Sequence, residues 1–116
     1  MRAIFAVVIG VAALLAACSS STSTTVANSC GSSGATANIN TASSNIFSPS
    51  AATITHGQSV CWQNSSAVAH TVTADNGAFN TSLPVGQIFV YMFSTAGSYP
   101  YHCTIHSGMT GTITVN

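Results

Sequence analysis

Residues 99–109, which read YPYHCTIHSGM, hold both a clear strand pattern and the densest set of metal-binding side chains in the chain. The first half alternates, so Tyr101 and Cys103 share one side of an extended backbone. The second half spaces a thiol, an imidazole and a thioether as Cys-x-x-His-x-x-Met, from Cys103 through His106 to Met109. We therefore predict a strand that runs into a short loop, and we expect that loop to supply three donors.

Short strand patterns recur along the rest of the chain, with turn residues between them. They are rich in β-branched and aromatic side chains, and glycines such as Gly57, Gly77 and Gly97 mark the turns. Regular spacing of this kind predicts an all-β fold, a sandwich of two sheets. The predicted strands lie near residues 37–39, 52–54, 60–63, 70–73, 89–93, 98–103 and 112–115.

The composition excludes two classes of function. The 116 residues contain one Lys or Arg and one Asp or Glu, so charged side chains make up 2% of the chain. A protein that binds nucleic acid through its phosphates needs a basic patch, which this chain lacks. Catalysis by a pair of carboxylates is also excluded, because Asp75 is the one acidic side chain.

The donors near the C-terminus are a mixture of soft and borderline metal ligands. His70, in an upstream strand, adds a second imidazole to Cys103, His106 and Met109. Two imidazoles and a thiolate in a plane, with a weak axial thioether, are typical of copper that cycles between Cu(I) and Cu(II). Zinc favours closed tetrahedra of Cys and His without the thioether. We therefore predict one copper ion.

These residues resemble those of the cupredoxins, the family of amicyanin and plastocyanin. The Cys-x-x-His-x-x-Met spacing is similar to that of amicyanin, and the resemblance covers roughly residues 37–116. It implies a cupredoxin-like Greek-key sandwich. The segments that carry it are residues 60–64 and 70–72 for the strand and first His, 75–79 and 84–87 for the following segment, 89–97 for the next strand and turn, and 99–109 for the copper loop.

The resemblance also implies roles for single residues. His70, Cys103 and His106 take the places of the equatorial copper ligands, and Met109 that of the axial one. Asn64 or its neighbours are implied to steady the ligand loops. The implied function is single-electron transfer between extracytoplasmic redox partners by a type 1, or blue, copper site, and not catalysis. We expect a monomer.

The imidazole edge of His106 is the expected exit for the electron, because it lies on the exposed loop. Around it we expect a small apolar patch made of Ala67, Val68, Ile105 and Met109. Such a patch can dock a redox partner briefly without charge pairing.

The N-terminus predicts export and lipid attachment. After Arg2, an apolar run of a length typical of signal peptides ends in Leu15-Ala16-Ala17-Cys18, which resembles a bacterial lipobox. We therefore predict a lipoprotein signal peptide at residues 1–17 and a lipid on Cys18. Residues 18–36 are rich in Ser and Thr and predict a flexible tether, and residues 37–116 form the copper domain. The protein is expected on a bacterial membrane, periplasmic or at the cell surface.

The remaining cysteines are Cys30 and Cys61, if Cys18 carries lipid and Cys103 binds copper. An oxidising compartment favours a disulfide between them. The alternatives are two free thiols or a bridge between molecules.

Two other functions stay open at this point. The chain can store, buffer or deliver copper without a redox partner, or it can be a structural surface lipoprotein with an immunoglobulin-like sandwich and no metal. His102 precedes Cys103, as in enzymes with several coppers, but strand alternation points it away from Cys103. With all four proposed ligands on one copper, no position is left for a substrate.

Overall fold

The computed structural model describes residues 29–42 and 44–116, which form eight strands and one short 3-10 helix. The predicted signal peptide and Cys18 lie outside the described residues. Within the described ranges, no helix is long and apolar enough to cross a membrane. The elements are η1 (Cys30–Ser32), β1 (Ala37–Thr41), β2 (Ala51–Ile54), β3 (Ser59–Asn64), β4 (His70–Ala74), β5 (Asn80–Leu83), β6 (Ile88–Met92), β7 (Gly97–His102) and β8 (Thr110–Val115).

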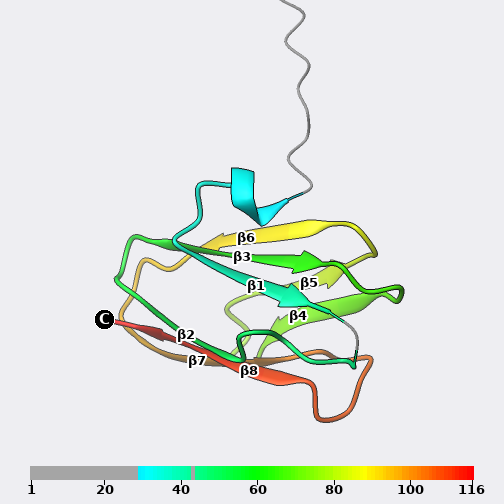
Figure 1. The fold of residues 1–116 in the computed structure, drawn as a ribbon. Helices are drawn as coiled ribbons and strands as arrows, with labels where there is room; N and C mark the ends of the chain where they lie inside the picture. The colour runs from blue at the N-terminus through cyan, green and yellow to red at the C-terminus, as the bar shows by residue number, and fades with distance from the viewer. Residues whose placement is uncertain (1–28, 43) are drawn as a thin grey trace, which may run out of the picture.

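The strands form two sheets that face each other, as the sequence predicted (Figure 1). One sheet has the order β1-β3-β6, and the other has the order β2-β8-β7-β4-β5. The chain crosses to the second sheet for β2 and returns for β3, so β1 and β3 lie parallel, as do β2 and β8. These crossovers bring the loops after β1, β3, β5 and β7 to one end of the sandwich, because the paired strands begin or end there.

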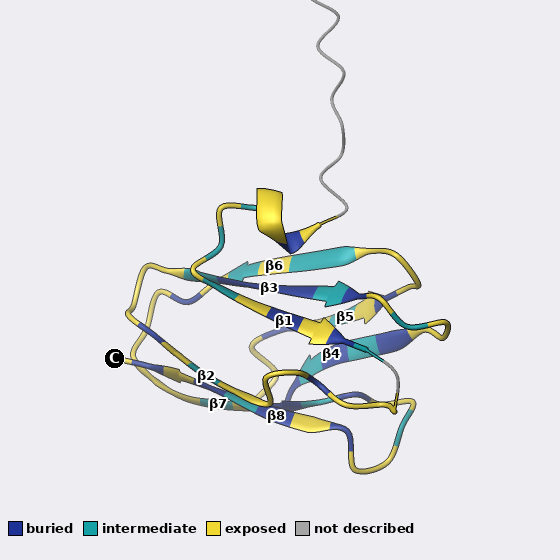
Figure 2. Ribbon diagram, in the orientation of Figure 1, coloured by how far each residue is buried: buried dark blue, intermediate teal, exposed yellow. Residues whose placement is uncertain are grey.

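The core lies between the two sheets and combines aliphatic side chains with a group of aromatic rings. Figure 2 shows buried residues on strands of both sheets. Trp62 of β3 is fully buried, and its ring lies 5.4–5.5 Å from the rings of Phe79, Phe89 and Tyr101. Val60 and Trp62 point inward, as the alternation predicted. Each large apolar side chain buried here stabilises the fold by about 1.5–3 kcal/mol. The sandwich therefore has a rigid centre beneath the loops.

Tyr101 links the core to the last strand. It pairs with Gly111 of β8 across the β7–β8 ladder, and a Cβ atom at Gly111 would overlap the Tyr101 ring. Within the described residues, neither the Tyr101 hydroxyl nor the Trp62 indole nitrogen has a hydrogen-bond partner. Burial raises the pKa of Tyr101 to about 12. Glycine at 111 is therefore required by the close approach of this ring.

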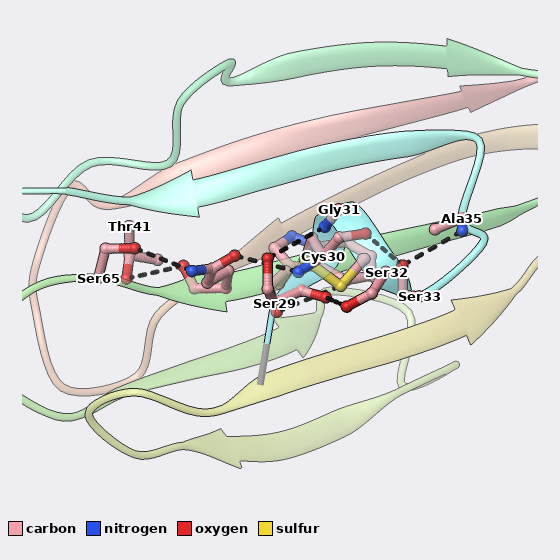
Figure 3. The surroundings of a disulfide bond; sticks show 11 residues. Ser29, Cys30, Gly31, Ser32, Ser33, Ala35, Thr41 and Ser65 are labelled. Carbon is pink, nitrogen blue, oxygen red and sulfur yellow. Dashed lines mark hydrogen bonds between the residues drawn. A yellow bond between two sulfur atoms is a disulfide. The ribbon is translucent and has the colours of Figure 1, made fainter. Parts of the chain in front are cut away.

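A disulfide joins Cys30 of η1 to Cys61 of β3, with Cα atoms 5.6 Å apart (Figure 3). The Cys30 amide also donates to Oε1 of Gln63, at 3.1 Å. Ser29 and Ser33 satisfy backbone groups of the helix. Residues 29–36, which the sequence analysis assigned to the tether, are thus held on the outer face of the three-stranded sheet. The structure confirms the bridge that the cysteine count favoured, and this bridge, not an apolar stripe, holds the segment.

Candidate metal centre

The predicted donors come from two neighbouring strands of the five-stranded sheet. His70 is the first residue of β4, where alternate residues are buried, so its ring points inward. Cys103 follows β7 directly, and it is buried like Tyr101 two residues earlier. Thr73 of β4 pairs with His102 of β7, which places the start of β4 beside the β7–β8 loop. That loop carries His106 and Met109.

Three donor atoms converge at this point. Nδ1 of His70 lies 3.2 Å from Nδ1 of His106 and 3.9 Å from Sγ of Cys103, and the remaining distance, Sγ of Cys103 to Nδ1 of His106, is 3.6 Å. These residues form a group that could hold a metal ion. The point equidistant from the three atoms lies about 2.1 Å from each, close to the length of metal–nitrogen and metal–sulfur bonds. The chemistry of the three donors and the distances between them therefore fit a copper ion.

Backbone hydrogen bonds hold the thiol and its loop. The amide of Thr71 donates to Sγ of Cys103 at 3.3 Å, and Oγ1 of Thr71 accepts from the amide of Thr104 at 2.8 Å. The Cys103 amide donates to the carbonyl oxygen of Met109 at 2.9 Å, which closes the loop on itself. The strand that carries His70 and the loop that carries Cys103 and His106 are thus fixed to each other.

The surroundings of His70 favour its neutral form. Burial lowers the pKa of His70, and the neighbouring His106 ring lowers it further. A neutral imidazole retains a lone pair that a metal can accept. His70 and Cys103 are buried, whereas His106 is partly exposed. The arrangement therefore has a shielded interior and one ring edge that reaches the surface.

Met109 lies at the end of the same loop and is 1% exposed. Its inclusion in the surface patch is therefore wrong, because the loop turns its side chain into the core. Ala67, Val68 and Ile105 are exposed as expected, and Val68 and Ile105 are about half exposed. Val85, which the sequence analysis did not include, is also about half exposed, in the β5–β6 loop at the same end of the sandwich.

His102 lies outside the group, as strand alternation predicted. Its Nδ1 is 2.6 Å from Oδ1 of Asp75, and the two side chains are 40% and 52% exposed. The strand turns this ring to the opposite face from Cys103. The resemblance implied that Asn64 or its neighbours steady the ligand loops, and the structure specifies one such contact, which the sequence did not: Oγ of Ser66 lies 2.9 Å from Nε2 of His70. A serine in a Ser-rich loop gives no signal of such a role.

Comparison with known proteins agrees with this geometry. The family model of the cupredoxin-like domain matches residues 6–115. The chain belongs to the cupredoxin family. It is 36% identical over 84 residues to plastocyanin from Scenedesmus fuscus, and that match covers 60% of this chain and 86% of the plastocyanin.

Solved cupredoxin structures share the fold. A purple cupredoxin from Nitrosopumilus maritimus superposes with a TM-score of 0.64 at 30% identity, over 69% of this chain and 99% of that one. A mutant of amicyanin in its reduced state gives a TM-score of 0.64 at 27% identity, over 72% and 83% of the two chains. The predicted family and sandwich fold are therefore confirmed, and copper is the cofactor of this cupredoxin-like chain.

Proposed function

We propose that this cupredoxin is a blue copper protein that carries single electrons between extracytoplasmic redox partners. The observation that carries the proposal is the convergence of Sγ of Cys103 with the Nδ1 atoms of His70 and His106. The likeness to plastocyanin and amicyanin supports it. In this proposal His70, Cys103 and His106 would hold the copper ion, and Met109, buried at the end of the ligand loop, would add its thioether as a fourth, weaker ligand.

When bound, copper supplies a one-electron couple between Cu(I) and Cu(II). The protein contributes a donor set that suits both states, because thiolate and thioether favour Cu(I) and imidazole also binds Cu(II). The rigid sheet end holds the donors in one arrangement, and the Thr71 amide keeps the Cys103 sulfur in place. Outer contacts of this kind orient metal ligands and tune the metal. Little rearrangement is then needed when the electron arrives or leaves.

The electron route in this proposal leads through His106. Its ring is partly exposed, whereas the other two equatorial donors are buried. Around it, Ala67, Val68 and Ile105 offer an apolar surface for a partner protein. After removal of the predicted signal peptide, Asp75 is the one side chain outside the histidines with a formal charge, so long-range steering by charge is weak. Docking then depends on the small apolar surface.

The proposal also places the protein on a bacterial membrane. A lipid on Cys18 anchors it outside the cytoplasm, residues 1–17 are removed as the signal peptide, and the Ser/Thr-rich segment from Cys18 onward separates the copper domain from the membrane. The domain works as a monomer. The Cys30–Cys61 bridge agrees with an oxidising compartment.

Voltammetry of the copper-loaded full-length protein tests electron transfer against copper storage. We expect one reversible one-electron wave, with the metal retained after repeated cycles. Cys103→Ser is expected to abolish the wave. The matched control His102→Gln changes the neighbouring residue outside the group and is expected to keep it. Absence of the wave in the unmodified protein with copper retained would instead favour a storage or delivery role, and loss of copper would contradict the electron-carrier proposal.

A further inference from the structure

The loop between β3 and β4 contains a serine whose hydroxyl is in contact with a proposed copper ligand. Oγ of Ser66 lies 2.9 Å from Nε2 of His70, on the opposite side of the ring from Nδ1. The same oxygen lies 2.7 Å from Oδ1 of Asn64 and 3.0 Å from the carbonyl oxygen of Val68. The direction of these hydrogen bonds decides where His70 carries its proton.

The orientation of Asn64 is fixed by its other contacts. This side chain is fully buried, and its Nδ2 donates to the carbonyl oxygens of Val68 and Leu83 at 2.8 and 2.9 Å. An amide nitrogen has two protons, so both are used. Oδ1 must then be the acceptor that faces Thr41 Oγ1 and the amide of Ser66. Exchanging the two ends of the amide would set Oδ1 against two carbonyl oxygens.

Ser66 is therefore a donor toward an oxygen and an acceptor toward His70. Its hydroxyl has one proton, and both nearby oxygens, Oδ1 of Asn64 and the carbonyl of Val68, can only accept. If the Ser66 proton pointed to His70, neither the contact with Asn64 Oδ1 nor the contact with the Val68 carbonyl would contain a proton. We therefore infer that the Ser66 proton points to one of these oxygens and that Nε2 of His70 donates to Ser66. The lone pair of His70 then lies on Nδ1, which faces Cys103 and His106.

We propose that Ser66 is a positioning residue, which holds His70 in the Nε2–H tautomer and so presents Nδ1 to the metal. The inference rests on the proposed copper site. The chain of contacts from Thr41 through Asn64 and Ser66 to His70 connects the last residue of β1 to a ligand on β4. Partners on the second ring nitrogen are known to fix the tautomer and orientation of metal-binding histidines.

Nitrogen-15 NMR of His70 in the metal-free full-length protein, above the pH at which histidines protonate, tests the tautomer directly. We expect the Nε2–H form in the unmodified protein and a mixture of both tautomers in Ser66→Ala. The Nδ1–H form in the unmodified protein would overturn the proposal, even if copper binds. Because this measurement needs no metal, its failure is distinct from failure of the proposed function.

Copper affinity gives the second readout, measured by competition of a Cu(I) chelator with the loaded protein. Ser66→Ala is expected to weaken Cu(I) binding about 10- to 100-fold. Ser66→Thr retains a hydroxyl and is expected to restore most of the affinity. Ser65→Ala is the matched control. It removes a hydroxyl of the same loop, and that hydroxyl contacts Gln63 and not His70. Equal affinities for Ser66→Ala and Ser65→Ala would overturn the proposal.

Discussion

Removal of the Cys30–Cys61 bridge is expected to cost a large part of the stability of this small domain. The cysteines are 31 residues apart in the sequence. The chain-entropy model assigns a loop of this length about 3.7 kcal/mol of stabilisation, because the bridge restricts the unfolded chain. For a domain of this size, 1 kcal/mol corresponds to a shift of about 4–8 °C in Tm. The predicted fall in Tm is therefore roughly 15–30 °C.

Thermal unfolding followed by circular dichroism measures this change in the double variant Cys30→Ala/Cys61→Ala. A Cys103→Ser background keeps the free thiol from exchanging with the bridge, since Cys103 is the free cysteine of the described residues. A reducing agent added to the bridged protein should give a similar loss, and it should leave the double variant unchanged. If both the double variant and the reducing agent lowered Tm by less than about 5 °C, the entropic reasoning would be refuted.

Three further predictions concern the core and the docking surface. Gly111→Ala forces a methyl group against the Tyr101 ring and should lower stability by about 1–3 kcal/mol; an unchanged denaturation midpoint would contradict the close packing. Burial raises the pKa of Tyr101 from 10.0 to about 12. The contribution of the neutral Tyr101 to the free energy of unfolding is therefore complete below pH 10 and is lost as the pH rises toward 12. Tyr101→Phe should remove that part of the alkaline loss, and equally steep curves of Tm against pH would argue against it. Ile105→Lys, on the exposed patch, should slow electron self-exchange about tenfold at low salt while leaving the visible spectrum unchanged, because two like charges meet at the docking end. An unchanged self-exchange rate, measured by NMR line broadening, would place the docking surface elsewhere.

Much of the fold was predictable because strand alternation is a local property. The inward positions of Val60, Trp62 and Tyr101 follow from a period of two, and the structure buries all three. The donors Cys103 and His106 lie in one short loop, so their spacing alone brought them together. His70 is 33 residues from Cys103; the donor chemistry and the sandwich prediction placed it beside the loop, and the family resemblance supplied its role as a ligand.

The features that the sequence did not reveal depend on contacts between distant segments. Residues 29–36 lack an apolar pattern, so their packing on the sheet was not predicted, although the Cys30–Cys61 bridge that holds them was. The burial of Met109 follows from how the ligand loop closes on Cys103, which spacing does not specify. The role of Ser66 depends on the direction of several hydrogen bonds around Asn64. A polar side chain in a loop carries no periodic signal of such a network.

The visible absorption spectrum of the full-length protein tests the central claim most directly. Cu(II) is added to the metal-free protein, ascorbate follows, and the protein is then reoxidised. The account predicts an intense thiolate-to-copper band that bleaches on reduction and returns on oxidation, and that is absent in Cys103→Ser. A colourless complex, or a band that persists without Cys103, would contradict a copper centre built on Cys103, His70 and His106.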